Sequence, residues 1–272
     1  MRVAIIAVVL CTLAALAAQA TTPFEREIEC PVGGERFSFT DTMSSSSFGQ
    51  RPDGRPYSNW HYPLPVCPGN GLVMYREFTA DDLARLPAIL QSPEFAELRA
   101  IEQPYYTASF IERSLSPGSV RATWLPLQAS WRVDHDAALK TRFQREFVAA
   151  AQAAEFDPAN EESAALRLRM ANALRELGRF DEAEAAFATL SQVSIEGADS
   201  FRNYVDILRG VNARRDTSAE PLDAVPQLVA ASLCLEHEGE AGWDAEGFCR
   251  APDLAAEVER IRENRRRAGM RR

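Results

Sequence analysis

Lysine is nearly absent from this sequence: Lys140 is the only one, and the rest of its 30 basic residues are arginines. Acidic residues number 39, so the 272-residue chain carries a formal net charge of −9. Attraction to phosphate is the main source of affinity in proteins that bind nucleic acids. The acidic balance therefore argues against a nucleic acid as the partner.

The sequence also lacks long apolar runs after its first twenty residues, and a transmembrane helix needs about 20 such residues. Residues 1–20 carry one positive charge at Arg2, then an apolar stretch, then Ala18-Gln19-Ala20. This order is typical of a secretory signal peptide that is cleaved before Thr21. An uncleaved membrane anchor is the alternative, but the run is short and its small residues favour cleavage. We therefore expect a periplasmic or secreted protein.

Motifs that mark common enzyme classes are missing as well. The sequence contains no nucleophile elbow, phosphate-binding loop, dinucleotide fingerprint or zinc-protease helix. Asp134-His135-Asp136 places acids beside a histidine, but adjacent residues on a helix point in different directions and do not readily form a dyad. We therefore assign no catalytic residue and no cofactor, and we favour a non-enzymatic role.

Cysteine is scarce and evenly numbered once the signal segment is removed. Of the five cysteines, Cys11 lies in that segment, which leaves Cys30, Cys67, Cys234 and Cys249. An even number in an exported protein indicates disulfides, and four cysteines allow three pairings. The motifs around them select one pairing.

Two short motifs contain the first two of these cysteines. Cys30-Pro31-Val32-Gly33-Gly34 and Cys67-Pro68-Gly69-Asn70-Gly71 each begin like the Cys-Pro-x-Cys-Gly turn of a zinc ribbon. Gly33 and Asn70 stand where each turn would carry its second cysteine, and two thiolates are too few for structural zinc. The retained cysteines occupy matching positions of facing turns, so we predict a Cys30–Cys67 disulfide. The second predicted disulfide is Cys234–Cys249, which pins an acidic loop.

Metal binding is the alternative for two histidine-containing segments. A site made from Cys30, Cys67 and His61 is conceivable, but a lone histidine among aromatic residues is more often packed or exposed than a ligand. His237 lies among glutamates, where a solvated acidic loop is the simpler interpretation. We therefore predict no metal site.

At this point the chain resembles a family of uncharacterised bacterial proteins, which pair a Cys-Pro-x-Cys-Gly ribbon with a tetratricopeptide-like helical half. The resemblance rests on both cysteine turns, on Arg55-Pro56, on residues 62–68 and on the segment from Trp124 to Trp131. It implies a small ribbon-like head followed by helices. The departures at Gly33 and Asn70 remove the inferred zinc site, and the family implies no known activity.

The remaining chain has helix signals throughout. Thr79 and Ser92 are expected caps, and the latter precedes a proline at the first helical position. Asp134 is expected to cap a helix from about His135 to Ala154. Further helices are expected at Ala198 to Asn212 and at Leu222 to Leu235.

One helical pair carries a repeat signal. Gly178, Phe180, Ala183 and Phe187 keep the spacing of a tetratricopeptide repeat, in which small residues let paired helices approach closely. Such a unit needs stacked neighbours to be stable. We therefore expect a mostly α protein of stacked helical hairpins over residues 78–272. A degenerate zinc-ribbon-like β knuckle over residues 21–77 precedes them.

These features favour an exported, non-catalytic scaffold that presents a groove to a protein or peptide partner in the bacterial cell envelope. The alternative is a small-molecule binder or enzyme with a candidate pocket between knuckle and helices. That pocket would be lined by His61, Tyr105, Trp124 and Trp131. Trp124 and Trp131 also form a stripe with Leu127 that favours a core position. Contact with anionic lipid is a lesser hypothesis, restricted to the arginine-rich C-terminus.

Overall fold

A computed structural model describes residues 22–269, and within that range the chain is mostly helical with two small β-hairpins. The strands are β1 (Pro23–Glu29), β2 (Arg36–Thr42), β3 (Ser47–Gln50) and β4 (Pro56–Ser58). The helices are α1 (Ala80–Leu90), α2 (Pro93–Arg99), α3 (Pro104–Leu115), α4 (Val120–Ser130), α5 (Ala137–Ala153), α6 (Glu161–Glu176), α7 (Phe180–Thr189), α8 (Ala198–Ala213), α9 (Gln227–Glu236) and α10 (Pro252–Arg267). The predicted signal peptide lies outside the described residues.

The strands form two separate antiparallel hairpins. β1 pairs with β2 from Pro23↔Thr42 to Glu29↔Arg36, and β3 pairs with β4. The alternating segment Phe37–Thr40 lies within β2, as its pattern predicts. One isolated antiparallel bridge, Val66↔Val73, flanks the second cysteine turn.

Side-chain caps start several helices at the expected residues. Thr79 and Asp82 form a capping box at α1, and Ser92 accepts a hydrogen bond from the Phe95 N–H at α2. Asn160 caps α6 by accepting from the Ser163 N–H. These caps satisfy backbone donors that a helix leaves unpaired in its first turn.

Two apolar clusters account for most of the core. The first joins the head to α1–α4: Cys30 and Cys67 are buried there with Leu86, Phe95 and Ile111. The second lies among α4–α8. It contains the buried stripe of α6 (Leu166, Met170 and Leu174) together with Ala183 and Phe187 of α7. The cysteine turns are therefore part of the interior, and the head is packed against the first helices.

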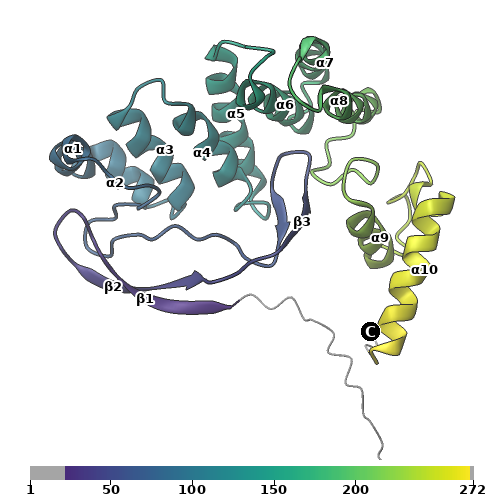
Figure 1. Cartoon of the computed structure of the whole chain (residues 1–272), viewed down its shortest axis with the longest axis horizontal. Helices are drawn as coiled ribbons and strands as arrows, with labels where there is room; N and C mark the ends of the chain where they lie inside the picture. Colours follow the sequence, from purple (N-terminus) through teal and green to yellow (C-terminus); the bar gives the residue numbers. More distant parts are fainter. Residues whose placement is uncertain (1–21, 270–272) are drawn as a thin grey trace, which may run out of the picture.

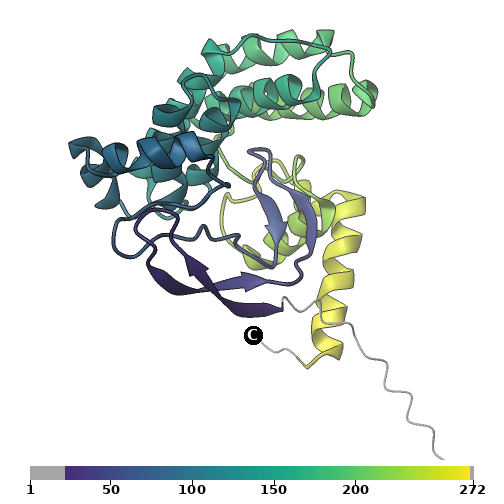
Figure 2. The ribbon, with the colours of Figure 1, turned by 60° about the vertical axis from the view of Figure 1, so that its left-hand side comes forward.

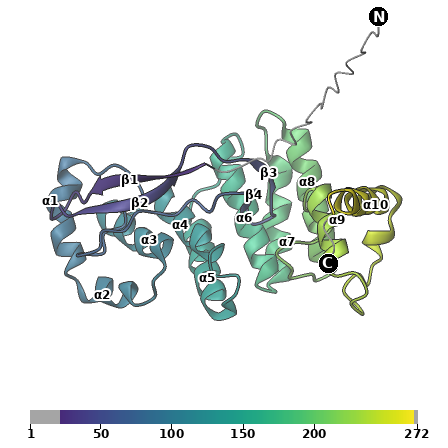
Figure 3. The ribbon, with the colours of Figure 1, turned by 90° about the horizontal axis from the view of Figure 1, so that it is seen from below.

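The helices α1 to α8 follow one another in an arc, and the strands lie on its inner side (Figure 1). Figure 2 shows β3 and β4 on the concave side of this arc, with α9 and α10 following α8. Seen from below, β1 and β2 extend across α1–α4, while β3 and β4 lie beside α6 (Figure 3). The segment between the two cysteine turns therefore passes along the inner face of the helical arc.

Two local predictions were wrong. Asp136, not Asp134, caps α5 by accepting from the N–H groups of Ala138 and Leu139. Asp134 instead forms ion pairs with arginines of the β3–β4 turn and with Lys140, which no local pattern indicates. The helix expected from Leu222 begins only at Gln227. Pro226 directly precedes this helix, and a proline favours an extended conformation in the residue before it in the chain.

Candidate functional site

The two cysteine turns share one backbone pattern. In each turn, the cysteine N–H donates to the carbonyl of the residue five positions later in the chain: Cys30 to Glu35 at 2.8 Å and Cys67 to Leu72 at 2.9 Å. The glycine four residues after each cysteine donates back to that cysteine's carbonyl, at 3.1 Å for Gly34 and 2.8 Å for Gly71. Both glycines have positive φ, which a residue with a side chain adopts only with strain. The motif glycines therefore shape both turns as the sequence predicts.

The turns face each other and are covalently joined. Cys30 and Cys67 form a disulfide with Cα atoms 5.7 Å apart, and Cys234 and Cys249 form the second. Asn70 donates through Nδ2 to the Val32 carbonyl at 2.7 Å, across from Gly33. The alternative metal site is not formed from Cys30 and Cys67, because each sulfur is bonded to the other. No cluster of three metal-binding side chains occurs within residues 22–269.

The turn of the β3–β4 hairpin, Arg51–Arg55, is a buried polar anchor in the helical arc. Arg51 is 4% exposed and Asp53 1% exposed, and the two form an ion pair. Arg51 also donates through Nη1 to Asp134 at 2.8 Å. Lys140 of α5 pairs with the same Asp134 at 2.8 Å. The ion pairs thus connect the hairpin turn to α5.

A side chain of helix α6 binds the backbone of the same turn. Arg169 donates to the Pro52 carbonyl at 2.7 Å. A Cβ added at Gly54 would lie 2.9 Å from Arg169 Nε, and Gly54 has φ +90°, so this position requires glycine. Arg175 donates to the carbonyl of Ser218, beyond α8, at 2.8 Å. The inner face of α6 is therefore already occupied by this chain's own backbone.

The ion pairs of Asp134 make stability depend on pH. Burial raises the pKa of Asp134, but hydrogen bonds and attraction from Arg51 and Lys140 outweigh burial and lower the pKa to about 2. A carboxyl pKa below its unfolded value of about 3.9 stabilises the fold above that value, and the contribution is lost as the pH falls towards 2.

We therefore expect Asp134→Asn to lower clearly the urea concentration at the midpoint of unfolding at pH 7. The difference from wild type should shrink as the pH falls from 4 to 2. Urea unfolding followed by circular dichroism at each pH measures it. Asp199→Asn, at a side chain that is 94% exposed, is the matched control and should change little at any pH. A difference that stays constant down to pH 2 would contradict the role of Asp134.

A cavity of about 420 Å³ lies beside this anchor, between the hairpin segment and helices α3 and α4. It brings together three of the four residues of the candidate pocket: His61, Tyr105 and Trp131. The fourth, Trp124, lines a different hollow and packs near Phe147 with ring centroids 6.2 Å apart. We call this space the aromatic cavity; its full lining is Gln50, Gly54, Arg55, Pro56, Ser58, Trp60, His61, Tyr62, Tyr105, Gln128, Trp131 and Arg132.

Tyr62 and Arg132 were not foreseen as residues of this cavity. Tyr62 has φ +47°, which is uncommon for a residue with a side chain. The Tyr105 hydroxyl donates to the Tyr62 carbonyl at 2.6 Å, and Arg132 Nη2 donates to it at 3.4 Å. Arg132 also stacks on the Tyr105 ring at 5.2 Å. The only sequence signal was the run of aromatic residues on either side of His61; nothing marked Arg132.

The lining of the aromatic cavity contains no carboxylate. Arg55 is paired with Asp134, whereas Arg132 has no acidic partner within residues 22–269. In a chain of net charge −9, such a positive, aromatic recess is suited to a ligand with an apolar ring and an anionic group. With a single histidine and no acid to orient it, the cavity is better equipped for binding than for proton transfer.

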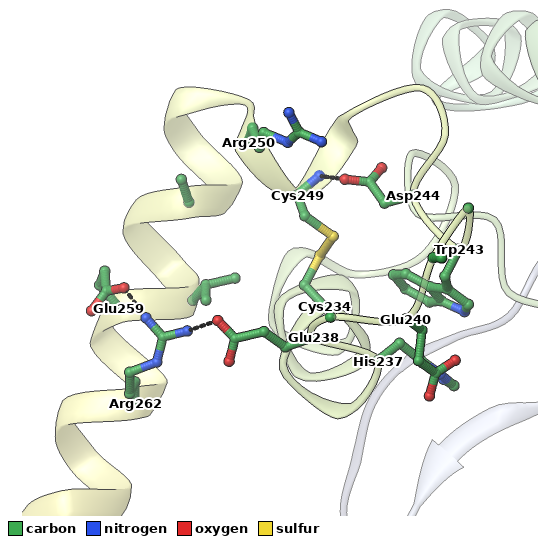
Figure 4. A pocket seen from close by; sticks show the side chains of 15 residues that line it. Cys234, His237, Glu238, Glu240, Trp243, Asp244, Cys249, Arg250, Glu259 and Arg262 are labelled. Atoms are coloured by element: carbon green, nitrogen blue, oxygen red, sulfur yellow. Dashed lines mark hydrogen bonds and ion pairs between the residues drawn. A yellow bond between two sulfur atoms is a disulfide. The ribbon is translucent and has the colours of Figure 1, made fainter.

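A larger hollow of about 700 Å³ lies at the C-terminal disulfide (Figure 4). His237 stacks on Trp243 with centroids 4.4 Å apart, and Asp244 accepts a hydrogen bond from the Cys249 N–H at 3.0 Å. Arg262 of α10 pairs with Glu238 at 2.7 Å and also with Glu259. Four carboxylates (Glu238, Glu240, Asp244 and Glu259) line this hollow against two arginines (Arg250 and Arg262), so its balance of charge is acidic.

Comparison with protein-family models, with curated proteins and with solved structures finds no match for this chain. The two disulfides indicate a non-reducing, extracellular-type compartment. Within residues 22–269, no helix combines the length and apolar character needed to span a membrane.

Proposed function

We propose that this protein is an exported, non-catalytic protein-interaction module of the bacterial cell envelope, and that it holds a partner polypeptide at the aromatic cavity. The aromatic cavity is the observation that supports this proposal. Aromatic side chains line it together with Arg132, which has no acidic partner within residues 22–269, and the lining contains no acid–histidine pair. Interfaces concentrate their binding energy in buried aromatic and arginine residues of this kind.

We infer that the helical arc is a tetratricopeptide-like stack. In support, α6 and α7 form a helical hairpin joined by residues 177–179, with Ala183 and Phe187 fully buried at the interface. Helix α7 in turn packs against α8, and α5 against α6. Open stacks of this type generally use their inner face for partners. Here the β3–β4 hairpin covers the inner face at α6, so the adjacent aromatic cavity is the surface left for a partner.

We also infer that the head descends from a zinc ribbon. The common hydrogen-bond pattern of the cysteine turns supports this, as does the position of Asn70 opposite Gly33, where each turn would have carried its second thiolate. On this interpretation the disulfide has taken over the role of the ion. The head then holds the segment from Trp60 to Tyr62 in place beside the helices.

Site-specific photo-crosslinking in the native host tests the proposed function. A photo-reactive amino acid replaces His61, which is exposed and lines the cavity. The control position is Arg145, which is exposed on α5 and lines neither the aromatic cavity nor the C-terminal hollow. We expect a discrete polypeptide adduct from position 61 and none from position 145. Identical adduct patterns, or no adduct at position 61, would argue against a protein partner.

A small-molecule ligand is the second candidate. Its specific support is the volume of about 420 Å³, because small-molecule sites commonly measure about 300–1,000 Å³. Thermal-shift screening with aromatic carboxylates distinguishes the two. A rise in the unfolding temperature that is lost in Arg132→Gln and kept in Arg145→Gln would favour this candidate.

A further inference from the structure

The aromatic cavity shares part of its lining with a second hollow. A space of about 380 Å³ on its other side is lined by Met43, Pro63 and Leu64, among others. Trp60, Tyr62 and Tyr105 line both spaces. The two hollows therefore adjoin across one aromatic ridge, and we call the combined surface the aromatic groove. A ligand that contacts both hollows must cross this ridge.

The lining of the groove contains groups that only donate hydrogen bonds beside groups that also accept, such as Gln50, Gln128 and Ser58. Arginine guanidinium and tryptophan indole groups only donate, and the aromatic cavity contains two of each among its lining residues. The Tyr62 carbonyl already accepts from Tyr105 and Arg132. Asp41, the one carboxylate of the second hollow, is paired with Arg26 at 2.9 Å. The carbonyl oxygens of a ligand can therefore pair with donors of this lining.

The Tyr62 ring is held on the ridge by a strained backbone. Its φ of +47° falls in the left-handed region, which a residue with a side chain adopts only where its surroundings hold it there. The Tyr105 hydroxyl supplies that support, and the Tyr62 side chain bonds to Ser45 at 2.7 Å. Tyr62 is nevertheless 41% exposed. A preorganised, exposed ring lowers the ordering cost of binding.

We propose that the aromatic groove binds an extended proline-rich segment of a partner protein, with an acidic residue of that segment on Arg132; this rests on the function proposed above. Proline has no N–H donor, so a polyproline II chain presents mainly carbonyl acceptors. Its rings pack on aromatic side chains, and its preformed shape costs little entropy on binding. A glycan is the competing ligand class, because the glutamine and serine side chains of the lining also bind hydroxyl groups.

Fluorescence anisotropy with synthetic probes tests this inference. The first probe is a labelled peptide of about nine prolines with one central aspartate, enough to cross both hollows at about 3.1 Å per residue. The second probe has alanine in place of each proline, the third has glutamine in place of the aspartate, and a chito-oligosaccharide serves as the competing glycan. We expect the first peptide to bind about tenfold or more tighter than the alanine peptide.

Two groove variants and one control sharpen the test. Tyr62→Gly removes the ring while keeping a residue that tolerates positive φ, and it should weaken the proline peptide by about tenfold. Arg132→Gln should weaken the aspartate peptide and leave the glutamine peptide unchanged. Phe48→Ala removes an aromatic residue that is 52% exposed and lies outside the groove lining, and it should have no effect. Circular dichroism confirms that each variant is folded.

Equal binding of the proline and alanine peptides, or capture of the glycan in preference to both, would overturn the inference. The proposed function is tested separately by the crosslink from position 61. If that crosslink forms while the proline peptide fails to bind, the ligand class is wrong and the protein-interaction function stands. If neither occurs, both are wrong.

Discussion

The double variant Cys30→Ala/Cys67→Ala is expected to lose about 4 kcal/mol of unfolding free energy in the chain-entropy model. The disulfide closes a loop with a sequence separation of 37, and both cysteines are buried against α1–α4. That amount is a large part of a typical total of about 5–15 kcal/mol. Urea unfolding without reductant, followed by circular dichroism, measures the change.

The second disulfide provides the matched control. Cys234–Cys249 has a sequence separation of 15, so its removal is expected to cost about 3 kcal/mol or less. It also connects only α9 to the loop before α10. The Cys234→Ala/Cys249→Ala variant should therefore retain the main transition of α1–α8. An unchanged midpoint in the Cys30→Ala/Cys67→Ala variant would contradict a stabilising role for the first disulfide.

Arg51→Met is expected to destabilise the protein by about 3–5 kcal/mol, because it leaves buried Asp53 without its ion-pair partner. The same substitution at Arg202, whose pair with Asp199 is exposed, should cost about 1 kcal/mol or less. Urea midpoints of both variants give the comparison.

A double-mutant cycle separates the loss of the Arg51–Asp53 ion pair from the cost of leaving the Asp53 charge buried without a partner. Arg51→Met/Asp53→Asn removes both charges, so it should recover part of the stability that Arg51→Met loses. We expect Arg51→Met also to weaken ligand binding, since Gly54 and Arg55 of the same turn line the aromatic cavity. If Arg51→Met behaves like Arg202→Met, the hairpin turn is not a buried anchor.

Local signals in the sequence predicted the parts of the structure that depend on local chemistry. The cysteine turns, the cap at Thr79 and the turn at Gly178 each follow from a few neighbouring residues. The disulfide pairing was predictable because two turns of the same type place their cysteines at matching positions. The capping error at Asp134 is also instructive, since Asp136 has the same capping chemistry and only distant arginines decide between them.

The buried anchor was not predictable from the sequence. A turn rich in proline, glycine and charge indicates a solvated surface, and only partners such as Asp134 and Arg169, far along the chain, make burial of Arg51–Arg55 tolerable. The aromatic cavity was predicted in part. Trp124 and Trp131 share a helical face, but two helical turns separate them by about 10 Å, so they line different hollows.

The most direct test is a non-reducing tryptic map of the protein purified without reductant. Proline follows Arg51 and Arg55 and blocks cleavage there, so residues 27–36 and 37–76 are the expected fragments around the head. The fold requires these two fragments to be linked through Cys30 and Cys67, and Cys234 and Cys249 to be bonded within the single fragment 216–250. Free thiols at Cys30 and Cys67, or a link from either to Cys234 or Cys249, would contradict it.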